Sequence, residues 1–176
     1  MKKKKMSFET RFWAAYEIND PFEVFEAFFD YDHLDDFKQR LGELMMYSHR
    51  HEVYDQKYPG RVFIMYAALR SFARACYVLQ LKSGKRVVIE AAAPESLLHQ
   101  ASLSVEEYKN PFLGFTNAFA VQTLVDYEFF LYEIAHLSLS PHTEQCDTDL
   151  ITPYIYFIKM LDAAQLLRER RLPKPE

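Results

Sequence analysis

The residues best suited to chemistry begin in the segment 47–60, whose sequence is YSHRHEVYDQKYPG. An apolar stripe with helical spacing over residues 34–44 continues from there into four polar residues: Ser48, His51, Glu52 and Asp55. His49 points away from this stripe, so the helix itself does not bring the two histidines onto one ligand. A carboxylate buried without a partner is strongly unfavourable. Glu52 and Asp55 must therefore reach water or meet a cation.

The candidate cations are Arg70 and Arg74, one turn apart in the segment 62–82. This segment is apolar on nearly all sides, which predicts a central helix. Two guanidinium groups at this spacing suit a carboxylate or a phosphate, which indicates an anion pocket. The alternative is an internal ion-pair network that orients the helices, in which Arg74 is buried and paired. The acids open to Arg74 are Asp30, Asp32 and Glu128, because Glu52 and Asp55 should lie nearer Arg61 and Tyr66.

The candidate ligand-binding cleft therefore consists of five residues: His51, Glu52, Asp55, Arg70 and Arg74. A ligand site requires all five side chains to line one concavity. The catalytic residues stay undefined, and the sequence indicates no cofactor.

Glu133 and His136 have the spacing by which one helix offers two ligands to a metal ion. A carboxylate-bridged centre needs a second such pair, which the sequence lacks. At helical spacing both residues also lie opposite the apolar side of their helix. We therefore predict no metal site at this pair. Cys76 and Cys146 fit no metal spacing either; they are predicted to be free buried thiols, with a single disulfide between them as the alternative.

Composition disfavours several other classes of function. The chain carries a net charge of −4, so it has no overall basic field for a nucleic-acid backbone. It contains no glycine-rich phosphate loop and no Gly-x-Ser-x-Gly elbow. Four lysines at residues 2–5 are not followed by the apolar run of a signal peptide, and no stretch approaches a membrane span. These features predict a cytoplasmic protein that does not enter the membrane.

Helix caps and apolar stripes predict one all-α domain, a bundle of about six to eight helices over residues 7–172. A disordered basic tail (1–6) precedes it and a frayed tail (173–176) follows it. Long helices are expected near 33–55, 62–82, 117–139 and 153–171. A shorter helix should span 8–18, another should begin at Pro21 behind an Asp20 cap, and Ser104 and Glu107 form a capping box. The alternative for residues 78–90 is a short β-hairpin, because Val87, Val88 and Ile89 favour a strand.

The final helix has more apolar surface than one packing face needs: Tyr154, Ile155, Tyr156, Ile158, Met160 and Leu161. This surplus predicts either a homodimer through residues 153–167 or insertion of the helix between two layers of its own domain. The leading functional prediction is therefore protein–protein binding without catalysis. The rival is a small-anion-binding protein or enzyme that uses the five-residue cleft. A third hypothesis, disfavoured by the acidic charge, is weak nucleic-acid binding through the basic tails.

Overall fold

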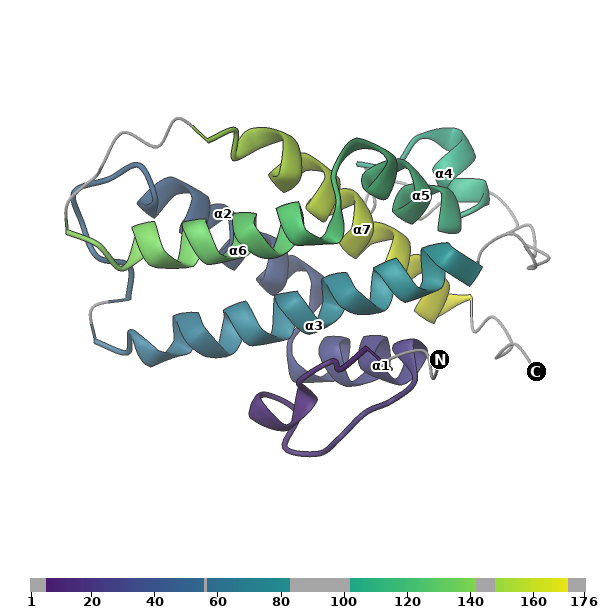
Figure 1. Cartoon of the computed structure of the whole chain (residues 1–176), viewed down its shortest axis with the longest axis horizontal. Helices are drawn as coiled ribbons and strands as arrows, with labels where there is room; N and C mark the ends of the chain where they lie inside the picture. Colours follow the sequence, from purple (N-terminus) through teal and green to yellow (C-terminus); the bar gives the residue numbers. More distant parts are fainter. Residues whose placement is uncertain (1–5, 56, 83–101, 142–147, 171–176) are drawn as a thin grey trace, which may run out of the picture.

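A computed structural model describes residues 6–55, 57–82, 102–141 and 148–170. Within these ranges the chain is all-helical and contains no strand. The α-helices are α1 (Pro21–Tyr31), α2 (Leu34–Tyr47), α3 (Gly60–Lys82), α4 (Val105–Lys109), α5 (Phe112–Val121), α6 (Leu124–Ser138) and α7 (Ile151–Glu169), and a 3-10 turn, η1 (Thr10–Phe12), precedes them. The predicted all-α bundle is thus confirmed (Figure 1).

The described helices pack around one hydrophobic core, with α3 and α7 at its centre. α3 contacts η1, α1, α5, α6 and α7, while α7 contacts every other α-helix (Figure 1). Aromatic rings fill much of the space between them. The Phe28 ring stacks on Phe37 and on Phe72, with centroids 3.8 and 4.7 Å apart. The high phenylalanine content is therefore used mainly as packing volume inside the bundle.

Three predicted helix starts can be compared with the capping chemistry that the structure shows. Asp20 accepts a hydrogen bond from the Phe22 amide, with Pro21 in the first turn of α1. Ser104 and Glu107 form the expected capping box at α4. At α2 the sequence favours Asp32 as the cap, but His33 occupies the cap position and Asp32 pairs with Arg40 at 2.7 Å.

The predicted helix over 117–139 is wrong, because two helices occupy this apolar segment. α5 ends at Val121, Gln122 is extended, and Thr123 caps α6 through a box with Asp126. In this box the Asp126 carboxylate accepts hydrogen bonds from the Thr123 amide and hydroxyl, and the Asp126 amide donates to the Thr123 hydroxyl. These bonds satisfy backbone amides at the start of α6 that have no partner within the helix. Local capping therefore overrides the continuity of the apolar run.

Two further helix predictions fail at their ends. The helix predicted over 33–55 stops at Tyr47, because the chain turns there and the Tyr54 amide donates to the Ser138 carbonyl of α6 at 2.8 Å. The helix predicted over 8–18 is reduced to η1, and the residues around it form an irregular segment across α3. Residues 78–82, the first half of the proposed hairpin, belong to α3, while residues 83–90 lie outside the described ranges.

The apolar surplus of α7 is used inside the domain. Phe157, Met160 and Leu161 are fully buried, Tyr154 and Ile158 pack against the core, and only Ile151 and Ile155 are exposed among its large apolar residues. The alternative of insertion between layers therefore describes α7. This burial removes the argument for a homodimer through residues 153–167, while the oligomeric state stays a prediction.

α3 also bears on the predicted absence of a membrane span. Gly60–Leu81 is long and apolar enough to cross a membrane by length and composition, contrary to the expectation from sequence. Of an 18-residue window within that stretch, 56% is buried inside the bundle, as in the central helix of many globular domains. The stretch is therefore weak evidence for a membrane helix.

Candidate ligand-binding site on α3

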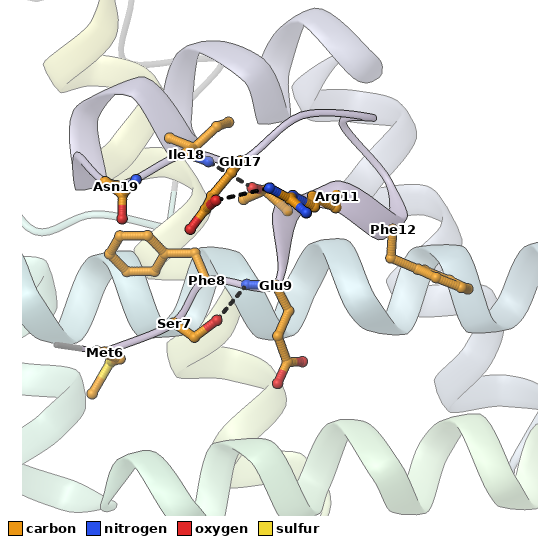
Figure 2. Close-up of a pocket in the computed structure, with 10 residues that line it drawn as sticks. Met6, Ser7, Phe8, Glu9, Arg11, Phe12, Glu17, Ile18 and Asn19 are labelled. Atoms are coloured by element: carbon orange, nitrogen blue, oxygen red, sulfur yellow. Dashed lines mark hydrogen bonds and ion pairs between the residues drawn. The ribbon is translucent and has the colours of Figure 1, made fainter. Parts of the chain in front are cut away.

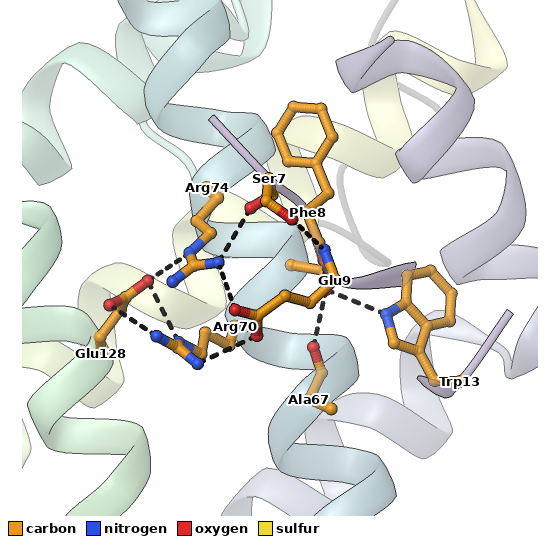
Figure 3. Close-up of polar contacts among 9 residues, drawn as sticks. Ser7, Phe8, Glu9, Trp13, Ala67, Arg70, Arg74 and Glu128 are labelled. Atoms are coloured by element: carbon orange, nitrogen blue, oxygen red, sulfur yellow. Dashed lines mark hydrogen bonds and ion pairs between the residues drawn. The ribbon is translucent and has the colours of Figure 1, made fainter. Parts of the chain in front are cut away.

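Arg70 and Arg74 lie one turn apart on the outer side of α3. The opposite side of the helix carries Leu69, Phe72, Ala73 and Cys76, all fully buried in the core. The arginine stems leave α3 beside α6 and beside the N-terminal segment, which brings acidic groups to both guanidinium heads (Figure 3). The side chain of Arg74 is only 13% exposed, so its predicted burial and pairing are confirmed.

Two glutamates hold the arginine pair from opposite sides. Glu128 of α6 lies 2.5 Å from Arg74 Nε and 3.3 Å from Arg70 Nε. Glu9 of the N-terminal segment lies 3.0 Å from an Arg70 terminal nitrogen and 3.2 Å from an Arg74 terminal nitrogen. With two cations and two anions, the cluster is formally neutral. Glu128 is among the partners predicted for Arg74, whereas Glu9 is not.

The electrostatics agree with a charged network. Desolvation opposes the charge on Glu128, but hydrogen bonds from Arg74 and Arg70 outweigh it and lower the pKa of this carboxyl. Desolvation likewise opposes the charge on Arg74, and the bond to Glu128 together with the charges of Glu128 and Glu9 raises its pKa. Both groups therefore stay ionised near neutral pH.

Residues 6–18, which we call the N-terminal strap, bring Glu9 to this cluster. Arg74 donates to the Ser7 carbonyl oxygen at 2.8 Å, and the Phe8 ring is buried in the core. Trp13 Nε1 donates to the Ser71 hydroxyl of α3 at 3.0 Å. That hydroxyl also lies within hydrogen-bond reach of the Phe8 and Ala67 carbonyl oxygens, to either of which it can donate (Figure 3).

The strap thus presents three groups to one helix: a backbone carbonyl, an aromatic ring and a carboxylate. Glu9 adopts a left-handed conformation (φ 52°) that a residue with a side chain rarely occupies. Its side chain remains 48% exposed although the carboxylate bridges both arginines. Because Glu9 is strained and half exposed, its carboxylate is easier to displace from the two arginines than that of the more buried Glu128.

The five predicted cleft residues fall into two separate groups. Arg70 and Arg74 belong to the cluster just described, while His51 and Glu52 are exposed in the connection after α2. Asp55 lies 3.9 Å from Arg61, near the start of α3. Nine residues of helix, about 13 Å, separate Arg61 from Arg70. The structure therefore does not bring these five side chains around one concavity, since the helix that was expected to carry three of them ends at Tyr47.

Asp55 instead borders a small hollow of about 80 Å³ together with Arg40, Tyr54 and Arg61. Tyr54 donates its hydroxyl to Glu43 at 2.6 Å, and burial together with this bond raises the pKa of Tyr54. The hollow has room for about two or three waters and no larger ligand. It therefore explains how Asp55 is accommodated and offers little space for a substrate.

Glu133 and His136 lie on the outer side of α6, as predicted from helical spacing. Tyr127, Leu131, Ile134 and Ala135 form the buried side of the same helix. The His136 ring stacks on Tyr132 with centroids 5.8 Å apart. In the described ranges no group of three or more His, Cys, Asp or Glu side chains is placed to hold a metal ion. Cys76 is a free, buried cysteine, and burial raises the pKa of its thiol; Cys146 lies outside the described ranges.

Two buried acids were not identified from sequence. Asp162 of α7 is fully buried, pairs with Lys38 of α2 and accepts a hydrogen bond from Ser102 at 2.5 Å. Glu107 of α4 pairs with Lys159 of α7 at 2.9 Å, and the net effect of its partners lowers its pKa despite desolvation. The available signal was that Asp162 is the sole acidic residue in the apolar run 151–167. Both acids join helices through their ion pairs.

A hollow of about 560 Å³ lies against the strap. Its lining comes from residues 6–12 and 17–19, so the two limbs of the strap enclose open space between them (Figure 2). The strap is therefore held mainly by its contacts with α3 and by a few hydrogen bonds and one ion pair between its two limbs.

No protein-family model matches this chain, and no curated protein or solved structure shows significant similarity to it.

Proposed function

We propose that this chain is a non-catalytic protein-binding module whose α3 surface accepts an extended segment with an aromatic residue followed by an acidic one. The observation that supports this proposal is the way in which Ser7, Phe8 and Glu9 are seated. Arg74 receives a backbone carbonyl, the core receives the Phe8 ring, and both arginines receive the Glu9 carboxylate. This combination of backbone bonds, an apolar anchor and a charge clamp is typical of peptide recognition.

The charges define the segment that the surface requires. Arg70, Arg74 and Glu128 together carry one net positive charge, and Glu9 neutralises it. An incoming segment without a carboxylate would leave partly buried guanidinium groups insufficiently paired, which is unfavourable. A segment without a large apolar side chain would leave the Phe8 site empty, at a cost similar to that of a core cavity. Both features are therefore required together.

The strap competes with any such partner because it occupies the same surface within the chain. The apparent affinity for a partner equals the intrinsic affinity reduced by the fraction of molecules whose strap is displaced. Weakening the strap should therefore strengthen binding. This relation distinguishes binding at the strap position from binding elsewhere on the molecule.

A labelled, terminally blocked peptide with the sequence of residues 6–13, MSFETRFW, provides the test. Fluorescence anisotropy compares its binding to the full wild-type chain and to the full chain with Phe8→Ala and Glu9→Gln. We expect the variant to bind at least about tenfold more tightly than the wild type. A peptide with Gln in place of Glu is the matched control and should bind the variant more weakly. Equal binding by both chains, or by both peptides, would refute the proposal.

A further inference from the structure

Hydrogen bonds and one ion pair connect the two limbs of the N-terminal strap, and a short connection joins the strap to the bundle. The Thr10 hydroxyl accepts a hydrogen bond from the Ile18 amide at 2.9 Å and donates to the Tyr16 carbonyl at 2.8 Å. Arg11 and Glu17 pair across the same loop at 3.0 Å (Figure 2). Asn19 and Asp20 then lead directly into α1. The strap is therefore a locally bonded segment that joins α1 through residues 19–20.

The strap contains strain and loose packing of its own. Two of its non-glycine residues have positive φ, Glu9 at 52° and Ala15 at 64°. The hollow of about 560 Å³ lies between its limbs, so they lack the close packing found in the bundle core. Its firm contacts are with α3 and α1, through Arg70, Ser71 and Arg74 and through packing of Trp13 against Phe28. A second copy of the chain would offer all of these contacts unchanged.

Large aromatic side chains remain exposed around the strap position. Phe63 of α3 and Phe129 and Tyr132 of α6 are each about half exposed, and Phe12 of the strap is 64% exposed. Phe63 and Arg70 share one side of α3, being seven residues apart, while Tyr132 lies one turn after Glu128 on α6 and Phe129 directly follows Glu128 in the chain. A second bundle brought against α3 and α6 would shield these rings from water.

We infer that the segment bound by α3 is the N-terminal strap of a second copy, so that two chains exchange straps reciprocally. This inference rests on the proposed binding function. In the exchanged pair, Glu9 of each chain bridges the arginines of the other, and each strap keeps its own internal bonds. Because both arrangements contain the same strap contacts, their balance depends on chain concentration and on the additional burial of the exposed aromatic residues.

Charge reversal tests the exchange. One full chain carries Glu9→Lys and a second carries Arg74→Glu. Within the first chain, the introduced lysine would face two arginines, and within the second, Glu9 would face two glutamates and one arginine. After exchange, the first chain's arginines receive the second chain's Glu9, as in the wild type. The second chain's surface, with Arg70, Glu128 and the new carboxylate, receives the introduced lysine and becomes neutral.

Sedimentation velocity of each chain alone and of the equimolar mixture gives the result. We expect each chain alone to be monomeric and the mixture to form a dimer, with native mass spectrometry showing one copy of each chain. Circular dichroism verifies the fold, and Arg70→Glu replaces Arg74→Glu if that variant does not fold. A mixture that remains monomeric would overturn the exchange. If the peptide still bound, the proposed function would survive; if it did not, both proposals would fail.

Discussion

Arg74→Ala removes the arginine with the most interactions in the cluster beneath the strap. The substitution eliminates contacts to Glu128 at 2.5 Å, to Glu9 at 3.2 Å and to the Ser7 carbonyl at 2.8 Å. Breaking a buried ion pair costs about 3–5 kcal/mol. The cost here should be smaller, because Arg70 remains to neutralise Glu128 and Glu9 is partly screened by water. We therefore expect a loss of about 2–3 kcal/mol in the free energy of unfolding.

Urea unfolding measures this loss. For a slope of about 2 kcal/mol per molar urea, the midpoint should fall by about 1–1.5 M. Arg61→Ala is the matched control on the same helix, because its side chain is 70% exposed and its pair with Asp55 spans 3.9 Å. The control should lose about 0–1 kcal/mol. Arg168 is a less suitable control, because it bonds both Glu26 and Asp30 and its side chain is 28% exposed.

A double-mutant cycle then isolates the interaction with Glu128. Arg74→Ala, Glu128→Gln and the double variant should show a coupling free energy of about 1 kcal/mol or more, since the two side chains are in direct contact. Equal midpoints for Arg74→Ala and Arg61→Ala, with unchanged slopes, would refute the assignment of Arg74 to a partly buried network. Additive effects in the cycle would show that Glu128 is not its partner.

Two further predictions concern the same region. The lowered pKa of Glu128 makes its contribution to stability complete above the ordinary glutamate value near 4.5 and lost as the pH falls through the folded value. The difference in stability between the wild type and Glu128→Gln should therefore shrink from neutral pH to about pH 3 in urea titrations. A difference that stays constant over this pH range would contradict the lowered pKa of Glu128. Phe8→Ala should lower the free energy of unfolding by about 2–4 kcal/mol because the ring is buried, whereas Phe12→Ala should change it by less than about 0.5 kcal/mol. Thermal unfolding of the dilute protein compares these two variants, and equal melting temperatures would contradict the placement of the strap.

The features that the sequence determined alone are those with local physical causes. Asp20 followed by Pro21 specified the start of α1, and Ser104 with Glu107 specified that of α4, because a cap satisfies amides only three residues away. Helical spacing placed Glu133 and His136 outside and Leu131 inside, since all three belong to one helix. The unusually apolar circumference of segment 62–82 likewise indicated its central position.

The errors arose where a local signal competed with another or with a tertiary contact. The box of Thr123 and Asp126 was present in the sequence, but the apolar run around it concealed the helix boundary. The end of α2 at Tyr47 accompanies a turn in which Tyr54 bonds the Ser138 carbonyl and Glu43. The sequence around residues 48–55 does not reveal these partners, so its polar stripe was extended along a helix that does not continue.

The candidate site was decided by tertiary structure in the same way. The sequence determined that Arg70 and Arg74 lie together on one side of a helix, because their four-residue separation is about one helical turn. Glu128 was one of three acids that the sequence offered as partners for Arg74, with no reason to prefer it over the other two. Nothing in the sequence indicated Glu9, which is 61 residues from Arg70. Only the folding of the strap across α3 placed that carboxylate against both guanidinium groups. Charge pairing between distant segments depends on how helices and loops pack, and no local spacing in this sequence encodes it.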